Sequence, residues 1–260
     1  MINMSRIEIV QFPYFSDNYG ILIHDKNTRK TVAIDAGDAL SYDKALDEKG
    51  WNLSEIWITH HHWDHTDGID SLYKRWRCKV IGPANHSTVP IKHLSEGVTE
   101  KDSFLFAGSP VKILHTPGHT LDMINFYLPS ENVLFSGDTL FSLGCGRVFE
   151  GNMSMMYDSL NKISALPNKT IIYCSHEYTK ANAIFALSVE PQNKALVSRF
   201  NEIEELVTSN KPTIPTNLEL EKKTNPFLRT SSPSIREKLD LPNASDSKVF
   251  SALREAKDKF

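Results

Sequence analysis

The sequence is poor in cysteine, in long apolar runs and in net charge, and each shortage excludes a class of protein. Three cysteines in 260 residues, Cys78, Cys145 and Cys174, are an odd and sparse set, typical of a reducing cytoplasm and not of a disulfide framework. No apolar run approaches the roughly 20 residues that a membrane helix needs. The net charge of -3 argues against a nucleic-acid surface. With 40% hydrophobic and 23% charged residues, the composition is that of a soluble globular protein.

The beginning of the chain lacks the pattern of a secretory signal. Residues 1–11 alternate as a strand does, instead of placing a basic stretch before an apolar one. This pattern and the lack of a membrane-length run predict a cytoplasmic protein. Met1 and Met4 both fit as the start of translation.

The most informative segment packs four histidines and an aspartate into six positions after an apolar, strand-like run at 55–58: His60, His61, His62, Asp64 and His65. Imidazole nitrogens and carboxylate oxygens are the usual ligands of a catalytic metal of the zinc class. His60 and His62 can converge on one ion, while Asp64 and His65 lie past the bend and can face a second. In an extended segment His61 points away from its neighbours, so we expect it to be structural.

Three more strand-like runs end in small residues followed by a metal-competent side chain: residues 111–115 precede His119, residues 132–135 precede Asp138, and residues 170–174 precede His176. Strand ends that feed loops are where a sheet presents functional side chains together. Four such segments in one chain predict a site with ligands for two metals.

These motifs resemble those of the metallo-β-lactamase superfamily and, more narrowly, of glyoxalase II, the hydroxyacylglutathione hydrolases. The superfamily motifs are Thr-His-x-His-x-Asp-His, Pro-Gly-His-Thr, Gly-Asp-Thr and Ser-His-Glu-Tyr-Thr. The narrower likeness rests on residues 144–151, 174–179, 225–229 and 254–260. The resemblance implies an α/β (α+β) fold: an αββα sandwich over residues 1–175, which holds a dinuclear metal site, and a small helical glutathione-binding domain over residues 176–260.

The resemblance assigns two divalent metal ions to seven ligands: His60, His62 and His119 on one metal, Asp64, His65 and His176 on the other, and Asp138 bridging both. We expect zinc, with iron or manganese as alternatives, because all three accept nitrogen and oxygen ligands. A bridging carboxylate holds two cations roughly 3.5–4 Å apart and leaves room for a bridging hydroxide as nucleophile. Asp64 and Asp138 are accordingly the catalytic carboxylates.

Three residues near these motifs have other expected roles. Asp35 is expected to organise a turn or a ligand close to the metals. Cys145 and Cys174 could be ligands or a nucleophile, but the histidine and aspartate set already fills two metals. A small buried thiol is the commoner fate of such a cysteine, and we expect that for both.

Glutathione carries two carboxylates and an ammonium, so its site should offer cations and amide-type donors. The resemblance places Arg147 beside the metals, with Phe149 where some relatives have tyrosine. His176 and Tyr178 are expected to meet the substrate as well. Arg254 and Lys257, three apart on a helix, share one face and are expected to bind the glycine carboxylate.

Periodicity predicts most secondary-structure elements. The predicted strands are 7–10, 20–24, 31–35, 55–58, 79–82, 104–106, 111–115, 132–135 and 170–174. The predicted helices are 38–49, 68–77, 152–165, 180–189, 193–209 and 245–258. Pro212 and Pro215 open a stretch through Arg229 that we expect to be irregular.

The implied activity is hydrolysis of the thioester S-D-lactoylglutathione, a 2-hydroxyacylglutathione, to glutathione and D-lactate, the second step of methylglyoxal detoxification. The alternative is a glutathione persulfide dioxygenase with one iron. Such enzymes share the ligand histidines but generally lack the Arg-x-x-Lys tail and the Asn-Pro-Phe-Leu-Arg segment present here. The expected partner is a small-molecule glutathione thioester, with no nucleic acid and no membrane, and the expected state is a monomer.

Overall fold

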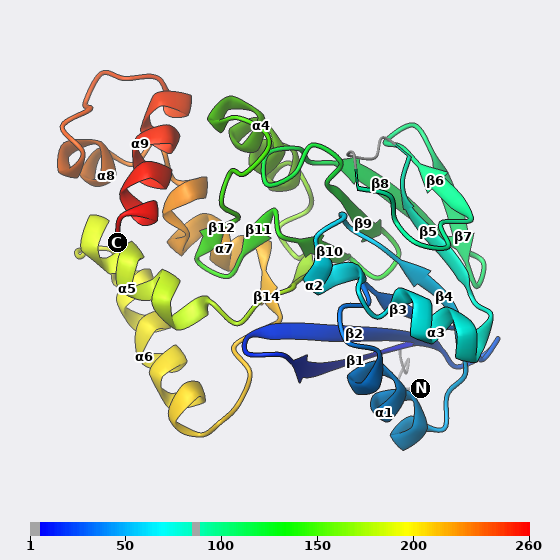
Figure 1. Cartoon of the computed structure of the whole chain (residues 1–260). Coiled ribbons are helices and arrows are strands. Elements are labelled where there is room, and N and C mark those ends of the chain that lie inside the picture. Colours follow the sequence, from blue (N-terminus) through cyan, green and yellow to red (C-terminus); the bar gives the residue numbers. More distant parts are fainter. Residues whose placement is uncertain (1–5, 85–88) are drawn as a thin grey trace. The chain divides into compact units, whose positions relative to one another are not determined.

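The computed structural model describes residues 6–84 and 89–260, which form two compact units (Figure 1). Unit 1 consists of Met1–His115 and Ile124–Ser130, and unit 2 of Thr116–Met123 and Glu131–Phe260. The predicted domain division at residue 175 was drawn from the sequence motifs, whereas the two units are defined by contacts within the structure. The domain division stays a prediction. Met1, Met4 and His86 lie outside the described residues. In the described part of the chain, no helix is both long and apolar enough to cross a membrane.

Unit 1 contains a six-stranded sheet with the order β1-β2-β3-β4-β5-β6 (Figure 1). Its strands are β1 Ile7–Tyr14, β2 Asn18–Asp25, β3 Thr31–Ile34, β4 Leu53–Trp57, β5 Lys79–Pro83 and β6 Glu96–Val98. The first three strands pair antiparallel, and the pairs from β3 to β6 are parallel. Parallel neighbours need crossover connections. Helix α1 (Ala39–Lys49) makes the first crossover, and α2 (Trp63–Thr66) with α3 (Ile69–Trp76) makes the second.

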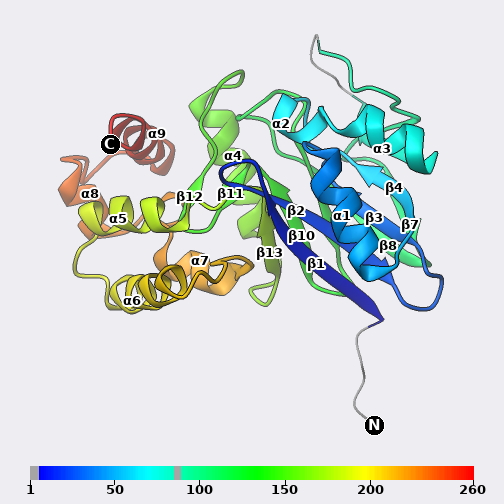
Figure 2. The same cartoon turned by 60° about the horizontal axis from the view of Figure 1, so that its bottom comes forward.

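Helices α1 and α3 cover one face of this sheet (Figure 2). Helix α1 begins where the Asp38 carboxylate accepts a hydrogen bond from the Ser41 amide, and it ends at Gly50 in the left-handed conformation. Tyr42 and Leu46 of α1 pack with Leu72 of α3 in the core against this face. The same helices therefore support the strand ends from which the histidine segment leaves.

A second group of strands faces the other side of the sheet within unit 1: β7 Ser103–Phe106, β8 Ser109–His115 and β9 Ile124–Leu128, which pair antiparallel. The buried Trp57 ring lies 5.0 Å from the Phe104 ring and 5.2 Å from the Phe126 ring, measured between centroids. Unit 1 thus contains a helix layer and two facing strand layers, which are three of the four layers predicted.

Unit 2 contains a parallel strand pair, one antiparallel strand and a short hairpin: β10 Val133–Gly137, β13 Ile171–Cys174, β14 Thr216–Asn217, and the hairpin strands β11 Leu140–Phe141 and β12 Gly144–Cys145. Its helices are α4 Met153–Ser164, α5 Thr179–Val189, α6 Lys194–Thr208, α7 Leu218–Thr224, the 3-10 helix η1 Pro226–Leu228, α8 Pro233–Lys238 and α9 Asp246–Asp258. In Figure 2 the helices α5 to α9 lie grouped at the C-terminal end of this unit.

Most predicted elements are confirmed to within a few residues, but the irregular stretch was wrong. Residues 218–228 form α7 and η1, and both begin at an asparagine whose side chain accepts a backbone hydrogen bond: Asn217 from the Leu220 amide and Asn225 from the Phe227 amide. Pro212 and Pro215 both lie in the loop before α7. They correctly indicated a break in regular structure there, but the two asparagine caps that follow were not recognised as helix starts.

Candidate metal centre

Unit 1 presents four of the predicted ligands on the segment that follows β4. The Nε2 of His60 lies 3.0 Å from the Nδ1 of His62, and the Nε2 of His65 lies 3.3 Å from the Asp64 carboxylate. Ligand atoms of His60 and His65 also come within 4.8 Å of each other. His60 and His65 are fully buried. These four side chains therefore lie close together within this unit, and their role as metal ligands stays a prediction.

The loop after β3 holds this segment in place. The Asp35 carboxylate accepts hydrogen bonds from the backbone amide and the hydroxyl of Thr59, and it lies 2.8 Å from the Nδ1 of His65. The Ala36 amide donates to the His65 carbonyl. A Cβ on Gly37 would lie 1.8 Å from the Asp64 carbonyl oxygen, so this close approach requires glycine. The expected organising role of Asp35 is confirmed.

Asn18 is a functional residue that the sequence analysis missed. Its side-chain amide donates to the Asp64 carboxylate at 3.0 Å, and the residue is buried at the start of β2. The pattern of a single asparagine after a turn carries no signal for such a contact. Only the antiparallel hairpin β1–β2 brings it to the site.

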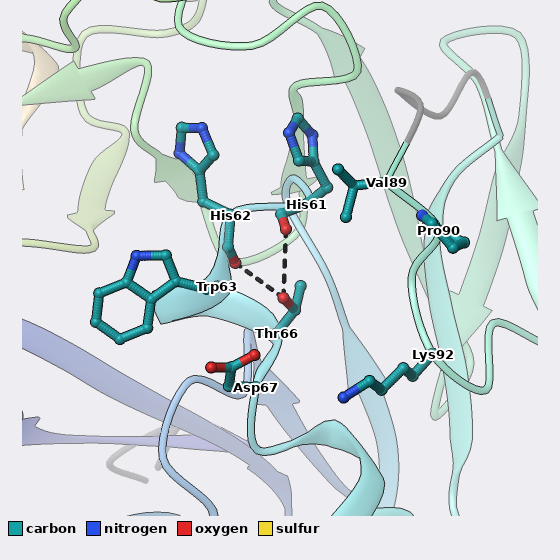
Figure 3. A pocket seen from close by; sticks show the side chains of 8 residues that line it. All are labelled: His61, His62, Trp63, Thr66, Asp67, Val89, Pro90 and Lys92. Carbon is teal, nitrogen blue, oxygen red and sulfur yellow. Dashed lines mark hydrogen bonds between the residues drawn. The ribbon is translucent and has the colours of Figure 1, made fainter.

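The expected structural role of His61 stays a prediction, but the extended segment on which it rested is not found. The segment bends into α2, where the Thr66 hydroxyl donates to the carbonyls of His61 and His62 (Figure 3). The ring centroid of His61 lies 5.1 Å from that of His62. A pocket of about 340 Å³ lies beside this bend. Figure 3 shows the side chains that line it: His61, His62, Trp63, Thr66, Asp67, Val89, Pro90 and Lys92.

Unit 2 brings together the other three predicted ligands. One oxygen of the buried Asp138 carboxylate lies 3.3 Å from the Nε2 of His119 and 3.4 Å from the Nε2 of His176. The other oxygen accepts a hydrogen bond from the Ser175 hydroxyl. Asp138 and His176 meet because β10 and β13 run parallel, so that both chain segments leave the sheet at the same edge. A carboxylate between two imidazoles is the arrangement expected of a bridging ligand.

Backbone packing fixes these three side chains. The Nδ1 of His119 lies 2.8 Å from the Arg147 carbonyl oxygen. The amide of Gly146 donates to the Thr139 carbonyl, and a Cβ on Gly146 would lie 2.0 Å from the Asp138 carbonyl oxygen. Glycine is therefore needed at position 146 of the Gly-Cys-Gly-Arg motif, because the backbone there lies close to the backbone of the turn at Asp138.

The donor set fits divalent metal ions. His60, His65 and His119 each place Nδ1 against an outer oxygen, and each directs Nε2 towards another ligand-type atom. Metal-binding histidines have this arrangement, because the outer hydrogen bond fixes the orientation and the tautomer of the ring. All seven predicted side chains belong to groups that could hold a metal ion.

Helix α9 and the segment after β12 form a cluster of cations in unit 2. The exposed Arg147 and the buried Arg254 both lie against the Asp258 carboxylate, at 3.3 and 3.0 Å. Lys257 lies over the rings of Phe185 and Phe260. Burial lowers the pKa of Lys257, and repulsion from Arg254 and Arg147 lowers it further, against an opposing effect of Asp258. Two arginines share the single Asp258 carboxylate and Lys257 lies beside them on α9, so positive charge remains for an anionic ligand.

Arg254 differs from Lys257 in its surroundings, although the sequence suggested equal roles. It is only 5% exposed, and its guanidinium donates to the Cys145 carbonyl at 2.9 Å. Its Nε is buried and has no hydrogen-bond partner in the described part of the chain. Asp258 was missed in the sequence, although its spacing of four residues from Arg254 on one helix is the signal for such a pair.

Aromatic rings surround His176. The Tyr178 ring stacks on its imidazole with centroids 4.8 Å apart, and the Phe141 ring meets both rings edge-on at 5.8 and 5.4 Å. Phe149, in contrast, is exposed and lies 5.2 Å from the His119 ring. The predicted substrate-binding residues of unit 2 thus lie next to its ligand histidines or in its cation cluster.

The three cysteines are all free and buried. Burial raises the pKa of Cys145 to about 11 and that of Cys174 to about 12. Such thiols are poor nucleophiles and poor ligands at neutral pH. The expectation that Cys145 and Cys174 are buried structural thiols fits these surroundings.

Known proteins resemble the chain along its whole length. Residues 18–176 match the model of the metallo-β-lactamase superfamily, and residues 177–260 match that of the hydroxyacylglutathione hydrolase C-terminus. The chain is 45% identical over 254 residues to a hydroxyacylglutathione hydrolase of Ruegeria pomeroyi, covering 98% of this chain and 99% of that protein. It is 46% identical over 255 residues to one of Brucella anthropi, covering 98% of each.

A solved structure agrees on the fold. The crystal structure of ETHE1 from Myxococcus xanthus covers 96% of this chain and 97% of its own, with a TM-score of 0.66 and 27% identity. The predicted fold, a metallo-β-lactamase fold followed by a helical C-terminal domain, is therefore confirmed. The fold and its histidine and aspartate sets support the binding of divalent metals. The chain belongs to the hydroxyacylglutathione hydrolase family of thioester hydrolases, within the metallo-β-lactamase superfamily.

Proposed function

We propose that this protein hydrolyses S-D-lactoylglutathione to glutathione and D-lactate with the help of two divalent metal ions, zinc in the first place. Relatives with 45 and 46% identity over nearly the full chain carry the hydrolase name. The observation that carries the proposal is that a chain with the seven predicted ligands also holds Arg147 and Arg254 against one carboxylate, that of Asp258, beside Lys257 on the same helix. The ligands would hold the metals needed for hydrolysis, and the cations would bind the glutathione carboxylates.

The proposed metal ligands are the seven side chains predicted from the sequence, with Asp138 shared by the two metals: His60, His62, Asp64, His65, His119, Asp138 and His176. When bound, divalent cations lower the pKa of a coordinated water towards neutrality and stabilise the developing oxyanion of the thioester carbonyl. Asp35 and the Arg147 carbonyl hold the rings of His65 and His119 in the orientation that ligation needs.

The glutathione part of the substrate is proposed to lie along the cation cluster. Lys257, partly buried on α9, is proposed to bind the glycine carboxylate. The hydroxyl-bearing ring of Tyr178 is half exposed and is held by its stack on His176. Phe149 offers a ring but no hydroxyl, so it contributes only packing. The glutathione thiolate is a good leaving group, and no side chain is needed as a strong acid.

Replacing Lys257 should affect substrate binding and not the chemical step. Lys257→Ala removes a charged contact worth on the order of 1.5–3 kcal/mol, so we expect KM for S-D-lactoylglutathione to rise about tenfold or more with kcat nearly unchanged. Steady-state kinetics measures both values. Lys259→Ala, at an exposed position on the same end of the chain, is the matched control.

Arg254→Ala should raise KM as well, but it should also lower the melting temperature, because its guanidinium is buried against the Cys145 carbonyl. A loss of kcat at constant KM in the Lys257 variant would contradict the assignment of this cluster to glutathione.

Hydrolysis and oxidation can be separated by excluding oxygen. We expect the protein to release free thiol from S-D-lactoylglutathione under strict anaerobiosis and to consume no oxygen with glutathione persulfide. About two metal ions per chain should remain after dialysis, because the ligand set serves a two-metal site. One iron per chain with persulfide-dependent oxygen uptake would instead identify a dioxygenase.

The location, the oligomeric state and the domain division are proposed on other grounds. Three free, buried cysteines suit a cytoplasmic protein. A monomer is proposed because each predicted ligand is supplied by this chain itself. The division into a metal domain at 1–175 and a glutathione-binding domain at 176–260 agrees with the ranges of the two family models.

A further inference from the structure

The β11–β12 hairpin joins the two parts of the substrate site in unit 2. It consists of residues 140–145, with Ser142 and Leu143 as its turn. On its first arm, Phe141 meets the rings of His176 and Tyr178. Beyond its second arm, the Arg147 carbonyl orients the His119 ring, and the Arg147 side chain joins the cation cluster. The shape of the hairpin therefore determines the positions of both groups.

The turn of this hairpin is strained. Leu143 has φ 58, in the left-handed region that residues with a Cβ avoid, and it is fully buried. Such a conformation persists only where the surrounding structure determines it, and it is concentrated at functional sites.

Two buried side chains of the C-terminal helices bind this turn directly. One oxygen of the Glu221 carboxylate accepts from the Leu143 amide at 2.9 Å and from the Asn225 side chain at 3.0 Å. The Asn225 amide also donates to the Gly144 carbonyl at 3.0 Å and lies 3.3 Å from that of Phe141. Both residues are fully buried.

An arginine completes the arrangement. Arg199 forms an ion pair with the other oxygen of Glu221 and donates to the Ser142 hydroxyl at 3.0 Å. It is 4% exposed. A buried ion pair is an inefficient source of stability, because the desolvation of both charges offsets their attraction. Its best-supported use is to specify one arrangement of the chain. We call Arg199, Glu221 and Asn225 the clamp.

We propose that the clamp is a positioning device for the substrate site: it holds the strained hairpin, and through the hairpin it sets Phe141 against His176 and Tyr178 and places Arg147 in the cation cluster. The three clamp residues are buried beneath the hairpin and act through it, so they are positioning residues. The inference rests on the proposed function for its kinetic test. The backbone contacts that carry it do not depend on that function.

Glu221→Gln tests the clamp. All four partners of the Glu221 carboxylate are donors, namely Arg199, Thr216, Asn225 and the Leu143 amide, so a glutamine NH2 must face donors on one side. We expect KM for S-D-lactoylglutathione to rise about tenfold, with kcat falling less than about threefold and the metal content unchanged. Amides of residues 140–147 should exchange hydrogen about tenfold faster or more.

Glu190→Gln is the matched control. Glu190 is also buried and ion-paired, to Arg229 at 2.8 Å, and it lies in the same unit. Among the described residues, its hydrogen-bond partners Asn193, Ser232 and Ser234 all lie outside the hairpin. We expect a comparable loss of thermal stability with KM and hairpin exchange unchanged. A general structural effect would raise KM in both variants, and that result would overturn the proposal.

Two further variants keep the test decisive if Glu221→Gln does not fold. Arg199→Met with Glu221→Met removes both charges and should restore stability while KM stays raised, because the hairpin contacts are still missing. Ser142→Ala keeps the ion pair and removes only the contact between the Arg199 guanidinium and the hairpin, with a smaller rise in KM expected. Normal KM and normal hairpin exchange in these folded variants would overturn the proposal.

The two proposals fail in different ways. If the wild-type protein does not hydrolyse the thioester, the proposed function is wrong, and the exchange rates of residues 140–147 together with calorimetric binding of glutathione still decide the role of the clamp. If the wild-type protein is active and the clamp variants behave as the control does, only the clamp is wrong.

Discussion

Asp138→Ala is expected to lower turnover of S-D-lactoylglutathione on the order of a thousandfold or more and to reduce the bound metal, because the proposed site shares this carboxylate between two metals. One of its oxygens lies 3.3 Å from the Nε2 of His119 and 3.4 Å from that of His176, and the other accepts from Ser175. Metal analysis after dialysis and kinetics with added metal measure the two effects.

The comparison with a single terminal ligand makes this test specific. His62→Ala should cost less than Asp138→Ala in both metal content and turnover, because His62 is proposed to bind only one ion. Asp158→Ala, on the exposed face of α4 in the same unit, should change neither. An Asp138→Ala protein that keeps two metals and near-normal turnover would contradict the bridging role.

Asp35→Asn is expected to weaken metal binding and activity by about 10- to 100-fold, although Asp35 is no ligand. Its carboxylate accepts from the Thr59 amide and hydroxyl and lies 2.8 Å from the Nδ1 of His65. An asparagine NH2 placed against Thr59 or His65 breaks one of these contacts, so the imidazole is no longer held for ligation through Nε2. Competition with a chromogenic chelator measures the affinity.

Asp25→Asn is the control for a loss of stability alone. Asp25 is equally buried in unit 1, and it accepts hydrogen bonds from the Thr28 amide and hydroxyl and pairs with Arg6, away from the histidine segment. The Asp25→Asn substitution should lower the melting temperature without changing the metal affinity. Equal metal affinities in the Asp35 variant and the wild type would show that the orientation of His65 does not depend on this carboxylate.

Local patterns predicted the strand ends that carry the candidate ligands. Apolar runs of four to five residues before His60, Asp138 and His176 are strands in the structure. A buried strand needs a continuous apolar run, and its end needs a turn, so both leave a readable trace in the sequence. The parallel pairing of β10 with β13 then brings Asp138 and His176 to one edge.

Contacts between distant segments left no such trace. No sequence pattern indicated that Asn18 meets Asp64, that Arg254 is buried against Cys145, or that Glu221 binds the Leu143 amide. These pairs are separated by 46, 109 and 78 residues. Each depends on where whole strands and helices pack, and the residue types alone suit many other partners.

The sequence by itself determined the chemistry of this protein: which nitrogen and oxygen ligands it offers, where strands end in them, and that a C-terminal helix with Arg254 and Lys257 on one face follows. These properties are local, because ligand type, strand periodicity and helix spacing are set by residues a few positions apart. Only the tertiary structure decided how the ligands are held. The bend into α2 left the rings of His61 and His62 5.1 Å apart, and the approach of the 35–37 loop oriented His65. The packing of α6 and α7 placed a buried ion pair under the strained turn at Leu143.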